Sequence, residues 1–303
     1  MIQYSIVYKV YNNLLKKNFN PDIIHSNVIF PAGILGTWLA GNTILPHVIT
    51  EHWSRLSSFM KKPVLRVFAK KAFQEASAIM PVSDFLAESI KLNIPYLNSK
   101  CFFVIGNVVN PEVFKFKEKS SEQNIIRFCA IATWNNKKTP DKLPLLFIKA
   151  LAEVQKEISR KIELIMVGGG DLIPELKNLC KYQNLDTKFT GYIPKSEIVK
   201  ELHKTDFLIH ASTIETFGVG IAEALTTGTP VICSNVGALP ELIDDSNGIL
   251  CTNDIEAWKF GIHKIISMQY NHVQISKNAK EKFSNQVIGN KIDLVYKSVI
   301  KSK

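Results

Sequence analysis

Two glutamates, Glu215 and Glu223, lie on either side of a glycine-containing turn in the segment SxxETFGVGIAEALTTGTPVI, which begins at Ser212. The segment follows the apolar run DFLIH and leads into a predicted helix. Gly218 and Gly220 would let backbone N–H groups approach a ligand closely, and the helix start would offer unpaired donors to a phosphate. The two carboxylates could then accept hydrogen bonds from sugar or ribose hydroxyls. A glutamate near a helix start is equally explained by stabilisation of the helix dipole.

Two further loops also join a predicted strand to a predicted helix. MVGGG (166–170) could cradle a phosphate, but it lacks the GxGxxG spacing, which favours a simple tight turn. ATWNNKKTPDK (132–142) contains Lys137 and Lys138, either of which could reach a diphosphate. Lysines in loops are usually only solvated, so neither loop identifies a site by itself.

A fourth loop, VITEHWSRLSSF (48–59), places His52 just after a predicted strand, with Glu51 beside it. A histidine there could orient or polarise a hydroxyl group, although a lone histidine is more often structural. His25 has the same ambiguity and carries less weight. The chain has no GxSxG, HExxH or Walker A sequence, which argues against hydrolase, zinc-protease and P-loop functions.

The elements that must position these residues alternate between short apolar runs and longer amphipathic stretches. The predicted strands are DIIHS (22–26), HVIT (47–50), AIMPVS (78–83), CFFVIG (101–106), IIRFCAIA (125–132), IELIMVG (162–168), TKFTG (187–191), DFLIHAS (206–212), PVICS (230–234) and GILCT (248–252). The predicted helices include 143–158, 173–183, 195–204 and 255–268. Strict alternation of this kind predicts parallel sheets with crossover helices, an α/β doubly wound architecture.

The polar stretch NPEVFKFKEKSSEQN (110–124) separates two such blocks and indicates a linker. We place the domain boundary near Lys119, with a first domain over 1–118 and a second domain from 119 onward. The second block has about six predicted strands, whereas the first has about four and opens directly on a helix. The first domain is therefore expected to be short.

The chain has 303 residues and a formal charge of +10, a balance that favours anionic partners. Its five cysteines are scattered, which argues against a disulfide framework or a zinc site and favours the cytoplasm. We find no secretory signal and no run long enough to cross a membrane. Basic and apolar residues alternate over 54–73, which predicts either a helix lying on anionic lipid or a core helix with a solvated face. Nucleic-acid binding has no motif behind it.

The stretch from Ile125 to Trp258 resembles the nucleotide-binding domain of the group 1 glycosyltransferases, glycosyltransferase family 4, which are retaining enzymes of the GT-B fold. The similar segments occur in family order, among them IELIMVGGGDLIPELKNL, FTGYIPKSEIVKELHKTDFLIHAS, the E-x7-E signature ETFGVGIAE and EALTTGTPVICSNVGALPELI. PDIIHSNVIFPAG, PHVITEHWS, AIMPVSDFLAESI and VIGNVVNPEVF resemble the later part of the acceptor domain. The resemblance implies two Rossmann-like domains facing a cleft. The second would cover 119–285, and a closing helix over 286–303 would cross back to the first.

The resemblance also implies roles for individual residues. Glu223 would hold the ribose hydroxyls of a nucleotide sugar, and Glu215 the hydroxyls of the transferred sugar. The remaining site residues would be His52 near the reacting sugar, Lys138 on the diphosphate, Phe217 and Gly218 as backbone donors, and Gly169 and Gly170 close to the nucleotide. The donor would be a nucleotide-diphospho-sugar, with no metal and no separate cofactor. The acceptor would be a hydroxyl of a surface glycan or glycolipid, which suits a cytoplasmic protein on the inner face of the membrane.

Two departures from the family pattern leave alternatives open. Thr133 stands where the family has an arginine about five residues before its diphosphate lysine. The family's first βα units, including a glycine-rich loop, have no counterpart before PDIIH. One alternative is a shortened relative that binds nucleotide or a partner without catalysis. A less favoured one is a nucleotide-sugar epimerase, which shares the architecture.

Overall fold

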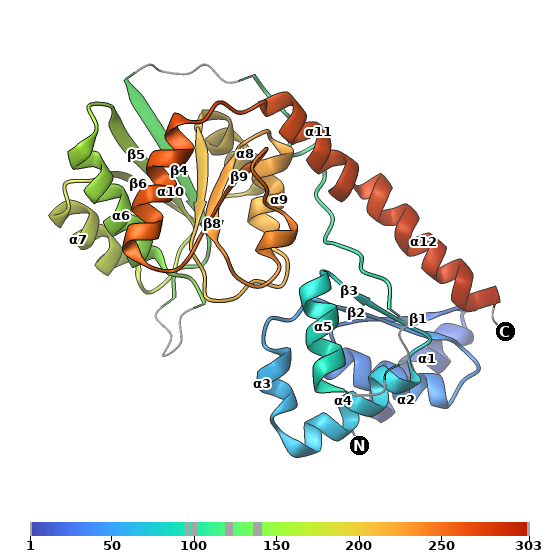
Figure 1. Cartoon of the computed structure of the whole chain (residues 1–303). Helices are drawn as coiled ribbons and strands as arrows, with labels where there is room; N and C mark the ends of the chain where they lie inside the picture. Colours follow the sequence, from blue (N-terminus) through green and yellow to red (C-terminus); the bar gives the residue numbers. More distant parts are fainter. Residues whose placement is uncertain (1, 95–96, 98–101, 119–123, 136–140, 302–303) are drawn as a thin grey trace. The chain divides into compact units, whose positions relative to one another are not determined.

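The computed structural model describes residues 2–94, 97, 102–118, 124–135 and 141–301. Contacts between residues divide the chain into two compact units (Figure 1). Unit 1 consists of Met1–Asn107 and Ile288–Lys303, and unit 2 of Val108–Val287. Each unit contains one parallel sheet, so the predicted α/β class is confirmed.

Unit 2 is built on a six-stranded parallel sheet in the order β6-β5-β4-β7-β8-β9. Its strands are β4 (Ile125–Ile131), β5 (Lys161–Val167), β6 (Asp186–Gly191), β7 (Phe207–His210), β8 (Val231–Ser234) and β9 (Gly248–Cys251). From β4 the chain adds β5 and β6 toward one edge of the sheet, and from β7 it adds β8 and β9 toward the other edge. The strand order therefore reverses between β4 and β7. In open parallel sheets, such a switch point places ligand-binding loops at the carboxyl ends of the strands.

The helices of unit 2 cover both faces of this sheet (Figure 1). They are α6 (Pro144–Glu157), α7 (Ile173–Tyr182), α8 (Lys195–Lys204), α9 (Val219–Thr226), α10 (Ile255–Ser267) and α11 (His272–Phe283). Right-handed crossovers place α6 and α7 on one face and α8 and α9 on the other. The central strands are buried on both faces, which explains why their sequences are continuous apolar runs rather than alternating ones.

Unit 1 contains a three-stranded parallel sheet in the order β1-β2-β3. Its elements are α1 (Ile2–Leu15), β1 (Ile24–Asn27), a π-helical turn over Ile29–Gly33, α2 (Ile34–Gly41), β2 (His47–Glu51), α3 (Leu56–Met60), α4 (Pro63–Glu75), β3 (Ala78–Pro81) and α5 (Asp84–Asn93). The long α12 (Asn285–Lys301) supplies Ile288, Val295 and Val299 to the core cluster that contains Val48 and Met80. Its apolar stripe therefore covers the sheet of unit 1.

Two predicted elements of unit 1 differ from the structure. The run 54–73 forms two helices instead of one, because Pro63 has no N–H group and starts a new helix after Lys62. The run CFFVIG is not a full strand. Within the described residues, Phe102 forms only an isolated bridge with Ile79, and Phe103 and Ile105 donate to the carbonyl groups of β3.

The contacts also divide the units at Asn107 and Val108 rather than near Lys119. The Val109 N–H donates to the Phe283 carbonyl at 2.8 Å, and Phe114 is buried within unit 2. Residues 108–118 therefore belong to unit 2. Their sequence is mostly polar, but it contains two buried residues, Val109 and Phe114, that contact this unit. Lys119 itself lies outside the described residues.

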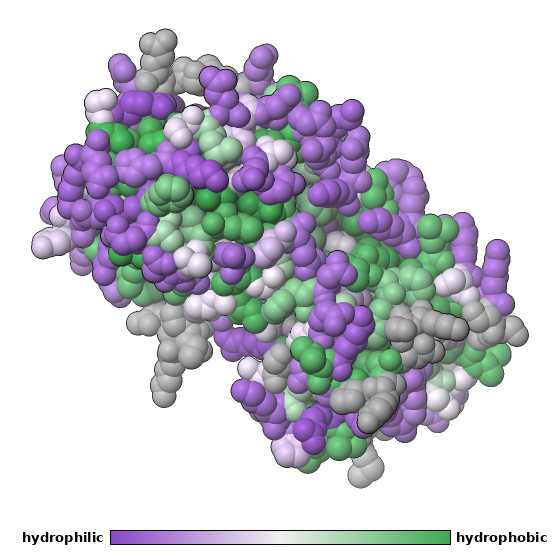
Figure 2. Space-filling model, viewed as in Figure 1, coloured by the Kyte–Doolittle hydropathy of each residue, from purple (hydrophilic) through white to green (hydrophobic). Residues whose placement is uncertain are grey.

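Hydrophilic side chains dominate much of the molecular face drawn in Figure 2, with hydrophobic side chains reaching the surface between them. None of the described helices is long and apolar enough to span a bilayer. Helix α4 exposes two apolar side chains, Val64 and Val67, which are 67% and 66% exposed.

Candidate functional site

The loop after β4 is tied to the loop after β5 at the carboxyl edge of the unit 2 sheet. The Trp134 N–H donates to the Gly169 carbonyl at 2.9 Å, and the Leu172 N–H donates to the Trp134 carbonyl at 3.0 Å. The indole N–H of buried Trp134 donates to the Val167 carbonyl. A Cβ at Gly170 would collide with the Trp134 carbonyl, so this turn needs glycine there. The glycine turn MVGGG therefore has a packing reason independent of any ligand.

The loop after β4 is also tied to the loop after β7. Lys142 and Ser212 form an antiparallel bridge, in which the Leu143 N–H donates to Ala211 and the Thr213 N–H to Asp141. The Ser212 N–H donates to the Ser234 hydroxyl at the end of β8. Four strand ends thus share one hydrogen-bonded loop layer, as the switch-point topology predicts.

Glu215 lies in this layer with its side chain largely buried. Its Oε1 atom accepts from the ammonium group of Lys142 and from Nε2 of His210, the latter at 2.8 Å. Because a carboxylate only accepts, Nε2 of His210 carries the proton in this contact. Burial by itself would raise the pKa of Glu215, but His210 and Lys142 outweigh it and lower the pKa to about 2. Glu215 is therefore an ionised, anchored acceptor.

Phe217 and Gly218 connect Glu215 to helix α9. Phe217 is buried, and its ring packs edge to face against Phe283 of α11 with centroids 5.5 Å apart. Gly218 is the N-cap residue of α9. The first N–H groups of an α-helix have no partner within the helix, so this end can receive an anion.

Glu223 lies on α9, one helix turn and more beyond its start, and is 7% exposed. Its Oε1 atom is 3.3 Å from the ammonium group of Lys195, the first residue of α8. Burial raises the pKa of Glu223, and the Lys195 charge opposes this rise. The loop and helix thus carry four of the predicted site residues together, namely Glu215, Phe217, Gly218 and Glu223.

His52 belongs to unit 1, where it follows β2 and is exposed. Its neighbour Glu51 is fully buried. The Glu51 carboxylate accepts from the backbone N–H groups of Ile29, His52 and Trp53 at 2.7–3.0 Å. Burial raises the pKa of Glu51, although these three hydrogen bonds oppose the rise. Glu51 therefore fixes the loop that carries His52.

His25 has a structural role in unit 1. Its ring nitrogens contact the Thr50 hydroxyl at 2.8 Å and the Tyr296 hydroxyl at 2.6 Å, which links β1, β2 and α12. Burial lowers the pKa of His25, so the ring is neutral near pH 7. The structural interpretation of this histidine is the better one.

Three residues near Glu215 escaped the sequence analysis. Lys142 and His210 contact its carboxylate, and Gly237 lies against its backbone with a positive φ of 56°. His210 carried a signal, because it stands at the end of an apolar strand run. Lys142 could not be distinguished from the other loop lysines. Predicted Lys138 lies outside the described residues.

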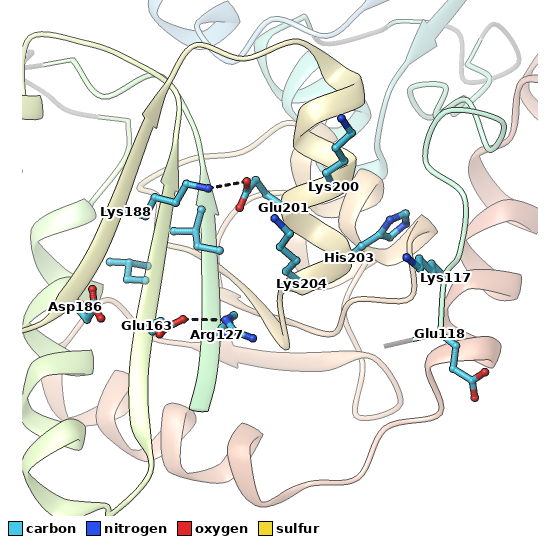
Figure 3. A pocket seen from close by; sticks show the side chains of 12 residues that line it. Lys117, Glu118, Arg127, Glu163, Asp186, Lys188, Lys200, Glu201, His203 and Lys204 are labelled. Atoms are coloured by element: carbon cyan, nitrogen blue, oxygen red, sulfur yellow. Dashed lines mark hydrogen bonds and ion pairs between the residues drawn. The ribbon is translucent and has the colours of Figure 1, made fainter. Parts of the chain in front are cut away.

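A groove of unit 2 lies elsewhere, along the amino-terminal half of β4, β5 and β6 beside α8 (Figure 3). Its volume is about 690 Å³. Its main charges neutralise one another, since Arg127 pairs with Glu163 and Lys188 with Glu201, each at 2.8 Å. By topology it is at the opposite strand ends from the loops that bear Glu215. In the described part of the chain, no group of three or more His, Cys, Asp and Glu side chains is arranged to hold a metal ion.

Comparison with known families places both units. Residues 111–282 match the family of glycosyl transferases group 1, and residues 3–113 match glycosyltransferase family 4. An uncharacterized glycosyltransferase of Methanocaldococcus jannaschii is 28% identical over 284 residues, covering 92% of this chain and 75% of the relative. An alpha-monoglucosyldiacylglycerol synthase of Streptococcus pneumoniae is 25% identical over 248 residues, covering 76% and 56%. The chain thus spans little more than half of the second relative.

Solved structures agree on the fold. HepE of Anabaena in complex with UDP superimposes with a TM-score of 0.79 at 22% identity, covering 97% of this chain and 82% of that chain. A glycosyltransferase of Rickettsia africae gives a TM-score of 0.77 at 21% identity, covering 97% and 81%. The architecture is GT-B, with two α/β units built on parallel sheets. The chain belongs to the group 1 glycosyltransferases.

Proposed function

We propose that the chain is a retaining glycosyltransferase that moves a sugar from a nucleotide-diphospho-sugar to a hydroxyl group of a surface glycan or glycolipid. The observation that carries this proposal is the arrangement of Glu215, Gly218 and Glu223 around the start of α9. Two carboxylates that accept hydrogen bonds there flank a helix end suited to phosphate. HepE has been solved with UDP and with UDP-glucose, which supports a nucleotide-sugar donor for this chain.

In this proposal, each residue has a defined role. Glu223 accepts from the ribose hydroxyls, and Glu215 accepts from hydroxyls of the transferred sugar. Backbone N–H groups of Phe217 and Gly218 take the diphosphate, while Gly169 and Gly170 border the nucleotide. His52 acts near the reacting sugar, and Lys138 stabilises the leaving diphosphate, whose negative charge grows as the glycosidic bond breaks. The positive groups and the helix end take this charge without a metal ion.

The test is calorimetric binding of UDP-, GDP- and ADP-sugars to the chain, with Glu223→Gln as the variant and Glu175→Gln as the control. Glu175 lies in the first turn of α7, so Glu175→Gln also replaces a carboxylate by an amide near a helix start, at a different place in unit 2. Selective binding that weakens by about tenfold or more in Glu223→Gln alone would support the proposal, since a lost hydrogen bond to a charged group is worth about 1.5–3 kcal/mol. Equal binding by both variants would remove Glu223 from the site.

Two alternatives are outcomes of the same series. A folded chain that binds no nucleotide sugar, or binds one without single-turnover transfer, is a non-catalytic relative. A chain that changes the sugar of the donor without any acceptor is an epimerase. Analysis of the reacted sugar separates the epimerase from the transferase, because a transferase leaves the identity of the sugar unchanged.

For the acceptor side, we propose that α3 and α4 lie on an anionic membrane surface. Helix α4 buries Ala69, Ala72 and Phe73, and it exposes Val64 and Val67. The exposed basic residues of the same segment are Lys61, Lys62, Arg66, Lys70 and Lys71. Exposed apolar side chains among basic ones suit a surface of anionic lipid headgroups. The S. pneumoniae relative, named for the synthesis of a glycolipid, supports a lipid acceptor.

Flotation with vesicles tests this surface. We expect the chain to float with vesicles that contain phosphatidylglycerol and to remain behind with pure phosphatidylcholine, because each basic residue near an anionic surface contributes about 1 kcal/mol. Arg66→Glu with Lys70→Glu should abolish flotation. The charge-matched control, Lys181→Glu with Lys277→Glu, changes exposed lysines of unit 2 and should leave it intact. Binding that ignores lipid charge would refute the proposal.

A further inference from the structure

Glu215 is held through one of its two carboxylate oxygens. Both of its side-chain partners, Lys142 and His210, contact Oε1. Within the described residues, Oε2 has no hydrogen-bonding partner, and the side chain keeps 15% of its surface exposed. One oxygen is thus saturated while the other is available to a ligand.

The two partners are themselves fixed by the fold. Lys142 is held by its backbone, because the segment around it pairs with the segment around Ser212 through two hydrogen bonds of 3.0 Å. His210 is the last residue of β7, where its side chain is 9% exposed. Lys142 and His210 thus come from separate segments that meet only in the folded unit, and their nitrogens lie 3.3 Å apart.

We propose that Lys142 and His210 are positioning residues that hold Glu215 by Oε1 and so present Oε2 to a hydroxyl group of the bound sugar. This inference rests on the proposed function, because it assigns a sugar to the site of Glu215. Its alternative is a purely structural ion pair, which would stabilise the loop layer without orienting a ligand. The positioning role and the structural role differ in their effect on sugar transfer. Only the positioning role predicts that removing the charge of Lys142 slows transfer while keeping that charge preserves the pH profile.

The charges around Glu215 give the proposal a pH signature. The groups that face the carboxylate are Lys142, His210 and the buried thiol of Cys233 on β8. The pKa of the Cys233 thiol is raised by burial, and also by the Cys251 thiol and the Glu215 carboxylate. Burial and Lys142 lower the pKa of His210, so near pH 7 its ring is neutral and Lys142 is the cation of the group. The His210 hydrogen bond and the Lys142 charge both lower the pKa of Glu215, so removing Lys142 should raise this pKa from about 2.

The experiment compares Lys142→Met with Lys142→Arg and His210→Gln. Lys142→Met removes the charge at similar length, Lys142→Arg keeps the charge, and His210→Gln keeps an N–H donor. The control is Lys188→Met, which also removes a lysine from an ion pair with a largely buried glutamate, Glu201. That pair lies in the groove of Figure 3, outside the loop layer of Glu215.

The first readout is transfer from the nucleotide sugar as a function of pH. For Lys142→Met, we expect kcat/KM to fall by about 100-fold near pH 7, the loss typical of a misplaced catalytic contact. The acid limb of its profile should move to higher pH, because the carboxylate now protonates there. Lys142→Arg and His210→Gln should keep the wild-type pH profile, and Lys188→Met should keep both the profile and the rate.

The second readout does not depend on activity. Carbon-13 NMR of labelled glutamate carboxyl groups identifies Glu215 as the resonance missing from Glu215→Gln. In the wild type, this resonance should stay in its ionised position as the pH falls, whereas in Lys142→Met it should titrate at a higher pH. The inference would be overturned if the Glu215 resonance titrated at the same pH in the wild type and in Lys142→Met. It would also be overturned if Lys142→Met kept the wild-type rate and pH profile. A wild-type chain without donor binding would instead overturn the proposed function, while NMR would still decide whether the carboxylate is held.

Discussion

Gly237 allows the chain after β8 to pass directly against the backbone of Glu215. Its φ of 56° lies in the left-handed region, and a Cβ atom there would collide with the Glu215 carbonyl oxygen. The Ala238 N–H donates to that same carbonyl at 2.9 Å, which fixes the approach. Because the obstacle is backbone rather than a flexible side chain, it cannot move aside without displacing Glu215.

We therefore expect Gly237→Ala to reduce transfer by about 100-fold through displacement of Glu215, and to cost about 1–3 kcal/mol in backbone strain. Gly289→Ala is the matched control, since Gly289 lies in helix α12 and a Cβ there meets no atom within 4 Å. Steady-state kinetics and denaturant unfolding of both variants check the prediction. Wild-type kinetics in Gly237→Ala would show that the Glu215 backbone tolerates displacement.

At the same scale, sequence reasoning could identify residues whose spacing alone carries a message. Glu215 and Glu223 stand out because a glycine turn and a helix start lie between them. Lys142 does not, because the contact that defines it joins positions 73 residues apart in sequence, whereas His210, 5 residues before Glu215, is marked only by its place at the end of an apolar run. Glu51 is a residue that the sequence placed beside a candidate histidine, but its carboxylate accepts hydrogen bonds from three backbone N–H groups and so has a structural role.

At the scale of elements, the loop before α9 depends on a helix far along the chain. Phe217 and Phe283 pack edge to face at 88°, and both are buried. Ser276 of α11 also donates to the Thr226 carbonyl at the end of α9, at 2.6 Å. Helix α11 thus supports both ends of α9, and with it the position of Glu223.

Phe283→Ala should destabilise unit 2 by about 3 kcal/mol, because it leaves a cavity against Phe217. It should also weaken donor binding, because the loop before α9 loses its support. Phe260→Ala is the control: its side chain is 72% exposed on α10, so the change should be within about 0.5 kcal/mol. Urea unfolding and donor titration measure both effects. A stable Phe283→Ala variant with normal donor binding would mean that α9 holds its place without α11.

The elements themselves were predictable where burial dictates sequence. The runs that became β3, β7 and β8 are apolar because these parallel strands are covered on both faces. The failures have local causes: Pro63 divides the predicted helix 54–73, and the run 101–106 makes only an isolated bridge and backbone contacts to β3. Neither outcome changes the positions of the site loops, because the loops follow the strands of unit 2.

At the scale of the whole molecule, each unit has its own core. Phe128, Leu164 and Trp258 belong to the core cluster of unit 2, whereas Val48 and Met80 belong to that of unit 1. The domain division was harder to predict than the strands, because buried Val109 and Phe114 lie within a polar stretch. Helix α12 is remote in sequence from the sheet of unit 1, yet it contributes three side chains to that core.

Separate cores predict separate responses to a ligand that binds one unit. Leu164→Ala in unit 2 and Met80→Ala in unit 1 each remove a fully buried side chain, and each should cost about 2–5 kcal/mol. In calorimetry, we expect the two variants to lower different unfolding transitions. A nucleotide sugar at about 100 times its Kd adds about 2.7 kcal/mol to the unit that binds it. The donor should therefore raise the midpoint temperature of the transition that Leu164→Ala lowers, and leave unchanged the transition that Met80→Ala lowers. An equal rise in both midpoints would contradict this prediction, because it would mean that the two cores unfold cooperatively when the donor is bound.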